Sequence, residues 1–335
     1  MNFLITGITG FVGPHLAKKL LDEEHKVFGL IRGTKGTHID ISDIVGDGVE
    51  KIEFLYGDFL SKSSLDRAFI ENKFDGVFHL GAQSHPPSSF KEPRLTYQTN
   101  ALGTVGLCES IQQFNSECVL MNCSTSEVYG ICEEGSLITE DFLINPMNPY
   151  GVSKAAADLY VLERTKNNFL KAYITRAFSH TGPRRAQNFS IASDAIQVAK
   201  IVLGKQDPII RIGNLESKRV VMDVRDVVDV YYKLMLKNIN GEMKNGEIFN
   251  VSGNGLCSMR YFLDVMLNLF SLEGKVTLEK DPKLYRPIDI PVQNPDSSKM
   301  RQFLNWEPKI PIERTLEDLV NYWIEKVSFD KDKFS

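Results

Sequence analysis

The sequence predicts an α/β protein built on a doubly wound parallel sheet, with a smaller α/β lid in its C-terminal half. Two features lead to this expectation. Short strand-like runs alternate with amphipathic stretches over the first half of the chain. A glycine-rich segment, Gly7 to Gly13, stands between the first strand and the first helix. At 335 residues the chain also exceeds the usual size of one domain, so a large unit with a smaller companion is expected.

Six strands are predicted in the first half, where short runs rich in β-branched and aromatic residues are bounded by turn-forming residues. They are Asn2–Thr6, Lys26–Ile31, Lys51–Tyr56, Gly76–Leu80, Cys118–Cys123 and Leu170–Arg176. Apolar residues at helical spacing predict helices at Pro14–Glu23, Asn100–Phe114 and Ala155–Asn168. This alternation is typical of a parallel sheet with helices on both faces.

The chain changes in character after about residue 180, where loops rich in Pro, Arg and Asn separate shorter elements. The elements predicted there are the strand Ile209–Ile212, the helix Val224–Leu236, the strand Glu247–Val251 and a closing amphipathic helix, Thr315–Lys326. We therefore expect residues 1–180 to form one domain. Residues 181–335 are expected to form mainly a second, lid-like domain, with some segments returning to the first.

Composition narrows the range of partners. Hydrophobic residues make up 42% of the chain and charged residues 24%, and the net charge of −4 offers no basic surface for nucleic acid or an anionic membrane. No apolar run reaches the ~18 residues that a membrane span needs, and the N-terminal segment reads as a strand rather than a leader, so a cytoplasmic protein is expected. The five cysteines show no CxxC pair or metal-ligand spacing, so neither a metal site nor a disulfide is predicted. Small molecules are the expected ligands.

The glycine segment has the context that a dinucleotide-binding motif requires. Its spacing is GxxGxxG, over Gly7, Gly10 and Gly13. Glycine lets the backbone approach a pyrophosphate, and the N-terminus of the following helix offers unpaired N–H groups and a positive dipole end. The sequence therefore predicts that residues 1–180 form a Rossmann domain that binds NAD or NADP.

Arg32 follows the second strand, where Rossmann proteins that prefer NAD place an acidic residue. A guanidinium there would pair with a 2′-phosphate, which favours NADP. If Arg32 is simply an exposed side chain, NAD remains the alternative. Gly57-Asp58 and residues 80–84 follow the third and fourth strands, so they are predicted to border the cofactor at the carboxyl edge of the sheet.

Tyr150 and Lys154 are four residues apart, which places a phenol and an ammonium on one face of a helix. A tyrosine has an unperturbed pKa of about 10, so it can act as a base near neutrality only if a cation stabilises the phenolate. Lys154 and an oxidised nicotinamide could both do so. A YxxxK pattern is common by chance, and its significance therefore depends on the segments around it.

Five segments of the chain, in this order, carry the resemblance to a known family. They are the glycine motif, Leu80-Gly81-Ala82-Gln83-Ser84-His85, Asn100-Ala101-Leu102-Gly103-Thr104, Ser124-Thr125-Ser126-Glu127-Val128-Tyr129-Gly130 and Tyr150-Gly151-Val152-Ser153-Lys154. Over almost its full length the chain resembles the extended short-chain dehydrogenases/reductases, in the branch of the nucleotide-sugar epimerases and dehydratases. The resemblance implies a Rossmann enzyme that acts on a nucleotide-sugar.

Within that branch, the segments 83–85, 124–127 and 180–185 most resemble GDP-mannose 4,6-dehydratase. The resemblance implies a C–O lyase with no net redox change. Its implied catalytic residues are Thr125, Glu127, Tyr150 and Lys154. Its implied cofactor contacts are Gly7, Thr9, Gly10, Phe11, Val12, Gly13, Arg32, Asp58, Phe59, Leu80, Ala82, Gln83, Ser84, Lys154, His180 and Arg185. Its implied substrate contacts are Ser84, His85, Ser126, Asn188, Arg219 and Arg286.

Physical reasoning supports several of these roles. Tyr150 can remove the proton of a sugar 4-hydroxyl while Thr125 holds that oxygen, and Glu127 can then take the C5 proton and assist the loss of water from C6. The alternative for Glu127 is a cap or an ion pair with a nearby Arg. Arginines such as Arg219 and Arg286 suit a substrate diphosphate, since a guanidinium meets phosphate oxygens bidentately. His79 lies inside an apolar strand and is expected to be a core histidine.

The chain also departs from the dehydratase pattern. Residues 213–219, 223–227 and 285–291 look at least as much like the GDP-4-keto-6-deoxymannose reductases. The basic residue expected within residues 190–193 and the second arginine expected after Arg32 are absent. The alternatives are therefore an NADPH-dependent reductase of such a 4-keto sugar, a C4 epimerase, or a non-catalytic NADP-binding sensor. The intact tyrosine, lysine, threonine and glutamate argue against the sensor.

The resemblance also implies self-association. The predicted helices Asn100–Phe114 and Ala155–Asn168 correspond to the paired-helix dimer interface of the family. We therefore expect a homodimer or a homotetramer.

Overall fold

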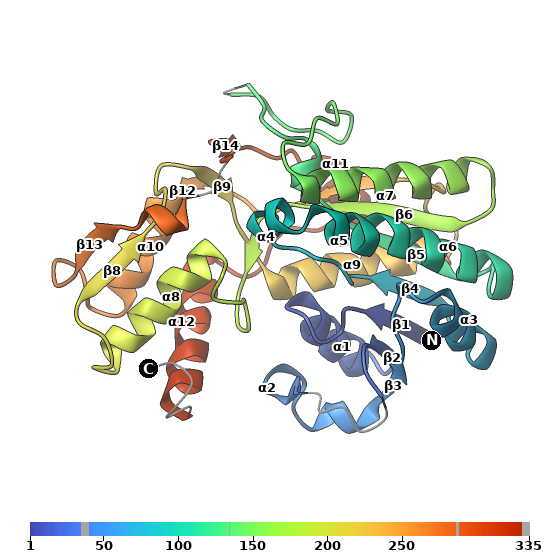
Figure 1. The fold of residues 1–335 in the computed structure, drawn as a ribbon, viewed down its shortest axis with the longest axis horizontal. Coiled ribbons are helices and arrows are strands. Elements are labelled where there is room, and N and C mark those ends of the chain that lie inside the picture. The colour runs from blue at the N-terminus through green and yellow to red at the C-terminus, as the bar shows by residue number, and fades with distance from the viewer. Residues whose placement is uncertain (35–39, 134, 286–287, 330–335) are drawn as a thin grey trace.

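A computed structural model describes residues 1–34, 40–133, 135–285 and 288–329 of the chain. Its centre is a parallel sheet of seven strands in the order β11-β6-β5-β4-β1-β2-β3 (Figure 1). The strands are β1 (Asn2–Thr6), β2 (Lys26–Ile31), β3 (Ile52–Tyr56), β4 (Gly76–His79), β5 (Val119–Thr125), β6 (Lys171–Ala177) and β11 (Ile248–Val251). The strand order reverses between β1 and β4, and ligands bind in the crevice at the carboxyl ends of such a switch point.

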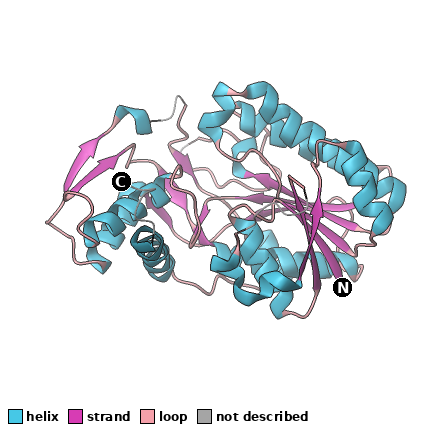
Figure 2. Ribbon diagram, turned by 60° about the horizontal axis from the view of Figure 1, so that its bottom comes forward, coloured by secondary structure: helices cyan, strands magenta, loops and turns pink. Residues whose placement is uncertain are grey.

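Helices cover both faces of this sheet, as Figure 2 shows. One face carries α1 (Val12–Asp22) and α9 (Val224–Ile239), whose Leu16 and Val227 are buried in one apolar cluster. The other face carries α3 (Lys62–Glu71), α6 (Gly103–Phe114) and α7 (Pro149–Lys166), which bury Leu65, Leu107 and Val161 in another. The predicted doubly wound α/β fold is therefore confirmed. Two short helices, α4 (Pro86–Lys91) and α5 (Pro93–Tyr97), precede η2 (Gln98–Leu102) and α6.

A smaller C-terminal lobe has its own apolar core and lies to the left in Figure 1. Its helices are α8 (Ser190–Val202), α10 (Met259–Leu269) and α12 (Ile312–Phe329). Its strands are β8 (Ile209–Ile212) paired with β13 (Thr277–Lys280), and β9 (Lys218–Val220) between β12 (Leu256–Ser258) and β14 (Val292–Gln293). Between the segments that build this lobe, the chain returns to the large sheet with α9, β11 and α11 (Ser298–Leu304), which packs beside β11.

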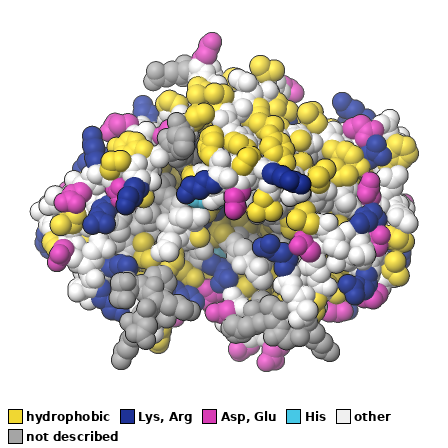
Figure 3. Space-filling view, viewed as in Figure 1, with side chains coloured by type: hydrophobic (Ala, Val, Ile, Leu, Met, Phe, Trp, Pro, Cys, Tyr) yellow, Lys and Arg dark blue, Asp and Glu magenta, His cyan; other side chains and the backbone are white. Residues whose placement is uncertain are grey.

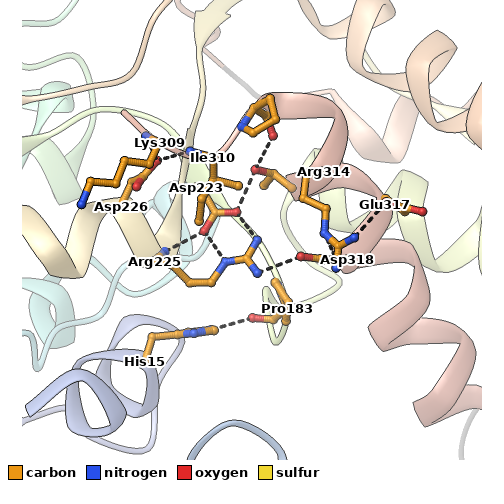
Figure 4. Close-up of polar contacts among 12 residues, drawn as sticks. His15, Pro183, Asp223, Arg225, Asp226, Lys309, Ile310, Arg314, Glu317 and Asp318 are labelled. Atoms are coloured by element: carbon orange, nitrogen blue, oxygen red, sulfur yellow. Dashed lines mark hydrogen bonds and ion pairs between the residues drawn. The ribbon is translucent and has the colours of Figure 1, made fainter. Parts of the chain in front are cut away.

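A polar junction joins the two lobes (Figure 4). Asp223 precedes α9 and accepts hydrogen bonds from the backbone N–H of Arg225 and from the Thr315 hydroxyl, at 2.7 and 2.8 Å. The Arg225 guanidinium pairs with Asp223 and also with Asp318 of α12, at 2.7 and 2.8 Å. Because α9 packs on the large sheet and α12 on the small core, these contacts fix the lobes around the crevice between them.

Every predicted element is present, and apart from the start of α7 the ends of the elements differ from the predicted ones by at most three residues. The largest shift matters for function: α7 begins at Pro149 instead of Ala155. Asn148 caps it, because its side chain accepts the Gly151 N–H at 2.8 Å, and proline is favoured in the first turn of a helix. The structure adds α3, α8 and α10, which were not predicted, although the buried apolar residues of α10 recur at helical spacing.

Candidate active site

The glycine segment forms a tight junction between β1, α1 and the end of β4. Gly7 adopts a φ of +72°, and a Cβ there would lie 2.8 Å from the backbone nitrogen of Gly81. A Cβ on Gly13 would lie 2.5 Å from the Gly7 carbonyl oxygen. No side chain fits at either position, so the backbone itself forms this wall of the crevice. Such a wall fits a dinucleotide pyrophosphate.

A single cavity of about 950 Å³ runs from this junction along the carboxyl edge of the sheet into the C-terminal lobe. Every predicted site residue that the structure describes lies in its lining. On the cofactor side these are Gly7, Thr9, Gly10, Phe11, Val12, Gly13, Arg32, Asp58, Phe59, Leu80, Ala82, Gln83, Ser84, His180 and Arg185. Toward the substrate they are Thr125, Ser126, Glu127, Tyr150, Lys154, His85, Asn188 and Arg219. Arg286 lies outside the described residues.

Tyr150 and Thr125 meet where α7 begins and β5 ends. The Thr125 side chain hydrogen-bonds the Tyr150 phenol, which is 8% exposed. Burial raises the pKa of Tyr150, so the phenol needs a nearby positive charge to act as a base. Lys154, one helical turn on and 3% exposed, has its pKa lowered by burial. The structure thus places a buried phenol and a buried ammonium one helical turn apart in the lining of the cavity.

Glu127 is positioned next to this pair by η3 (Ser126–Val128), the turn that follows β5. Its backbone N–H donates to the Thr125 hydroxyl at 3.2 Å, and its carboxylate accepts from the Asn148 amide at 2.8 Å. A Cβ on Gly151 would lie 2.7 Å from the Glu127 carbonyl oxygen, so the first turn of α7 packs directly on η3. Asn148 therefore fixes both α7 and the carboxylate. The sequence signal for it was an asparagine before a proline at a helix start.

A buried polar cluster that the sequence did not reveal lies beneath Lys154. Asp158, fully buried one turn after Lys154, pairs with the Arg176 guanidinium at 3.2 Å and accepts hydrogen bonds from Asn122 and Ser124 at 3.0 and 2.8 Å. Burial raises the pKa of Asp158, while the Arg176 charge opposes that rise. The Asp158 carboxylate in turn acts to raise the pKa of Lys154, against the stronger effect of burial. The sequence did offer one sign of this contact, because Asp158 stands four residues after Lys154 and so lies on the same face of the helix.

Rings and cations stack across the cavity at its mouth. Arg185 lies over the Phe189 ring at 3.5 Å and over the Phe11 ring at 4.7 Å, and Phe11 stacks on His180 with centroids 5.8 Å apart. Burial and the Arg185 charge lower the pKa of His180 to about 4. Arg184 bonds the Gly10 carbonyl at 3.2 Å and pairs with Asp43. These contacts tie the glycine loop to the segment that leads into the C-terminal lobe.

His79 is a core histidine, as predicted. Its ring nitrogens bond the hydroxyls of Thr6 and Thr104 at 2.8 and 3.0 Å, and burial lowers its pKa to about 3. In the described part of the chain, no group of three His, Cys, Asp or Glu side chains could hold a metal ion. None of the described helices is both long enough and apolar enough to cross a membrane.

The C-terminal lobe lines the part of the cavity that lies furthest from the glycine junction. Arg219 on β9 is 8% exposed and pairs with Asp289 at 3.5 Å. The Ser126 hydroxyl donates to Gln293 at 3.4 Å, which links η3 to β14. Asn188 and Ser84 are exposed and lie at the mouth. The cavity therefore runs from the glycine junction, past the polar residues at the end of β5 and the start of α7, into the small lobe.

The sheet order, the glycine junction and the buried tyrosine and lysine on α7 define a short-chain dehydrogenase/reductase fold of the extended type. A family model described as GDP-mannose 4,6 dehydratase matches residues 4–319. The chain belongs to this family.

Individual relatives match the chain over almost its whole length. The GDP-mannose 4,6 dehydratase of Cricetulus griseus is 31% identical over 350 residues, which cover 96% of this chain and 91% of the relative. The GDP-6-deoxy-D-mannose reductase of Pseudomonas aeruginosa is 28% identical over 327 residues, covering 97% of this chain and 98% of the relative. The solved structure of RMD from Pseudomonas aeruginosa, complexed with NADPH, superposes with a TM-score of 0.81 at 25% identity, over 97% of this chain and 99% of that one.

Proposed function

We propose that the protein is an NADP-dependent 4,6-dehydratase of a GDP-hexose, GDP-mannose or a close relative of it. The observation that carries this proposal is the placement of Glu127. A second base stands beside Tyr150 and Thr125, and Asn148 holds it there at 2.8 Å. Simple oxidation or reduction at C4 needs only the tyrosine, whereas loss of water across C5 and C6 needs a second group to take the C5 proton.

The proposed roles of the residues follow from their positions. Tyr150 removes the proton of the 4-hydroxyl, Thr125 holds that oxygen by a hydrogen bond, and Lys154 stabilises the phenolate. NADP, when bound, would accept a hydride from C4 and later return it to C6. The 4-ketone makes the C5–H acidic. Glu127 then takes the C5 proton and gives a proton to the departing C6 hydroxyl, so that water leaves. C5 regains a proton as the hydride is returned to C6, and the proton that Tyr150 took from the 4-hydroxyl balances this step.

The choice of cofactor and nucleotide rests on several residues and on the relatives. Arg32 lies in the cavity lining at the end of β2, where a guanidinium suits a 2′-phosphate, and the superposed Pseudomonas protein was solved with NADPH. The glycine junction would hold the pyrophosphate. Arg219 reaches the substrate branch, where it would pair with the diphosphate of the sugar nucleotide.

A reductase is the second candidate. The Pseudomonas reductase aligns over 98% of its own length, more than the 91% of the Cricetulus dehydratase. In that case Tyr150 would act as the acid that protonates the C4 oxygen, and NADPH would be consumed. The two activities differ in stoichiometry, because a dehydratase needs no added reductant.

The deciding experiment incubates the protein with GDP-mannose and no added NADPH, followed by mass spectrometry. The dehydratase proposal expects a product lighter by one water. Glu127→Gln should slow this reaction about 10²- to 10⁴-fold, while Glu279→Gln, an exposed glutamate of β13, should not. Unchanged GDP-mannose together with NADPH consumption on a 4-keto-6-deoxy GDP-sugar would assign the reductase instead.

We also propose that the protein self-associates through α5, η2 and α7. Hydrophobic side chains gather over these elements in Figure 3, and the exposed ones are Leu95, Tyr97, Leu102, Val152 and Leu159. Leu102 and Leu159 are 63% and 57% exposed, which favours burial against a second copy. Light scattering should give a dimer or tetramer for the native chain and a monomer for Leu159→Glu. Leu269→Glu, on the exposed end of α10, is the control and should not dissociate it.

A further inference from the structure

Asp194 on α8 is a buried carboxylate that the proposed reaction does not use. It is only 6% exposed and lies in the lining of the cavity, within the branch that enters the C-terminal lobe. Among the residues that the structure describes, none forms a hydrogen bond or an ion pair with it. A buried carboxylate without partners is costly, and such a group in a binding cavity is a candidate for meeting the ligand itself.

Its surroundings are those of a binding site for a flat ring. Ile191, one turn earlier on α8, belongs to one apolar cluster with Leu215, Val221 and Met259, and all four line the cavity together with Asp194. The loop that carries Leu215 is fixed by backbone hydrogen bonds from Met259 to Ser217 and from Arg260 to Leu215, at 2.9 and 3.0 Å. The lobe core thus gives this part of the cavity apolar lining residues, and Asp194 adds a carboxylate that has no partner among the described residues.

The order of groups along the cavity indicates which part of a sugar nucleotide would lie there. The sugar must lie at Tyr150 and Glu127, and a diphosphate at Arg219. The nucleoside then extends further into the lobe, toward the recess of Ile191, Leu215 and Met259. Asp289 in the same lobe is already engaged by Asn214, Ser217 and Arg219, which leaves Asp194 as a carboxylate that can meet the base. When ionised, its two oxygens can only accept hydrogen bonds.

Resting on the proposed use of a GDP-sugar, we propose that Asp194 recognises guanine through its N1–H and 2-amino groups. Guanine presents two adjacent donors on its Watson–Crick edge, and a carboxylate offers two adjacent acceptors. Uracil, cytosine and adenine each place an acceptor beside a donor there, which a carboxylate repels. Asp194 is therefore a specificity residue of the substrate site.

The pKa of Asp194 is that of a carboxyl group without a hydrogen-bond donor beside it. Burial raises the pKa of Asp194 to about 8, so the acid is largely protonated at neutral pH when nothing donates to it. Two N–H donors would stabilise the ionised form and lower that pKa again. Guanine supplies both donors at once.

The test measures binding of GDP and inosine diphosphate to the NADP-saturated protein by calorimetry. Inosine diphosphate lacks only the 2-amino group. The native protein should bind GDP about 10- to 100-fold more tightly than inosine diphosphate, the range expected for one charge-assisted hydrogen bond. Asp194→Asn should weaken GDP by a similar factor and bring the ratio between the two ligands close to one. Asp207→Asn, an exposed aspartate of the same lobe, should change neither value.

The outcomes are distinct. The assignment is overturned if the native protein binds GDP and inosine diphosphate with equal affinity. It is also overturned if Asp194→Asn binds GDP as tightly as the native protein does. If the native affinities are equal and the variant loses affinity for both ligands equally, Asp194 contacts the ribose instead of the base. Unchanged NADP binding by the variant shows that the fold is intact. If guanine preference depends on Asp194 but GDP-mannose is not dehydrated, the proposed function alone fails. If dehydration occurs and the variant keeps its guanine preference, the present inference alone fails.

Discussion

Replacing Arg176 by methionine should destabilise the protein severely, because it leaves the Asp158 carboxylate buried without its counter-charge. The two side chains are 2% and 0% exposed, and their 3.2 Å contact is supplemented by hydrogen bonds from Asn122 and Ser124 to the same carboxylate. Removing one partner of a buried ion pair costs about 3–5 kcal/mol. The Arg176 side chain also donates to the Tyr129 hydroxyl at 3.1 Å, so the cost should lie toward the upper part of that range.

Thermal unfolding in the absence of nucleotides gives the first measurement. An unfolding entropy of about 2.1 cal/mol/K per residue over 335 residues converts this loss into a fall in Tm of about 4–7 °C. The double variant Arg176→Met with Asp158→Asn should recover much of the loss, because a neutral amide can still accept the hydrogen bond from Ser124. The reasoning is refuted if the double variant loses more stability than the two single variants lose together. Such a result would mean that the cost of Arg176→Met does not come from an unpaired Asp158 charge. Asp264→Asn, an exposed aspartate of α10 paired with Arg260, is the surface control and should cost about 1 kcal/mol or less.

Three further changes test the site. Gly13→Ala should abolish cofactor binding, since its Cβ would lie 2.5 Å from the Gly7 carbonyl oxygen. Gly106→Ala in α6 is the control: its Cβ would lie 3.6 Å from the nearest atom, and the change should stabilise the helix by about 0.5–1 kcal/mol. Equal NADP binding by both variants would contradict this prediction. Tyr150→Phe should lower turnover at least ~10²-fold with NADP affinity retained, as steady-state rates and fluorescence titration would show. Asp194→Asn should melt at a higher temperature than the native protein at pH 7. The native pKa of about 8 exceeds the ~3.9 of the unfolded chain, so native stability falls as pH rises between these values, by at most about 4 kcal/mol at pH 7; the advantage should vanish near pH 4.

The strands of the large sheet could be predicted because both of its faces are covered. β1 and β2 appear at their predicted bounds, since buried parallel strands are short runs of apolar residues between turns. The helices α3 and α8 escaped prediction for different reasons. α3 has a polar, serine-rich first turn, and α8 carries small residues that pack without a clear stripe of large apolar side chains.

The site residues that were predicted lie in motifs that are local in sequence. The glycine segment, residues 124–130 and the Tyr150–Lys154 pair each carry their chemistry within a few positions. Gly7, residues 9–13, residues 124–127, Tyr150 and Lys154 line one cavity. Asn148 and Asp194 could not be assigned in this way. The role of Asn148 depends on the approach of α7 to η3, and the importance of Asp194 on the absence of a partner among the described residues, both of which are tertiary facts.

The repeated return of the chain to the large sheet limits how such a protein can be cut or recombined. A fragment ending near residue 180 would lack β11, which pairs with β6, and α9, which packs on α1. It would present an unpaired strand edge and a bare apolar face, both of which favour aggregation. A chimera that takes its nucleotide specificity from a relative therefore has to exchange three separate segments, residues 181–222, 253–293 and 311–329. The segments between them, which carry α9, β11 and α11, have to stay with the large sheet of the parent protein.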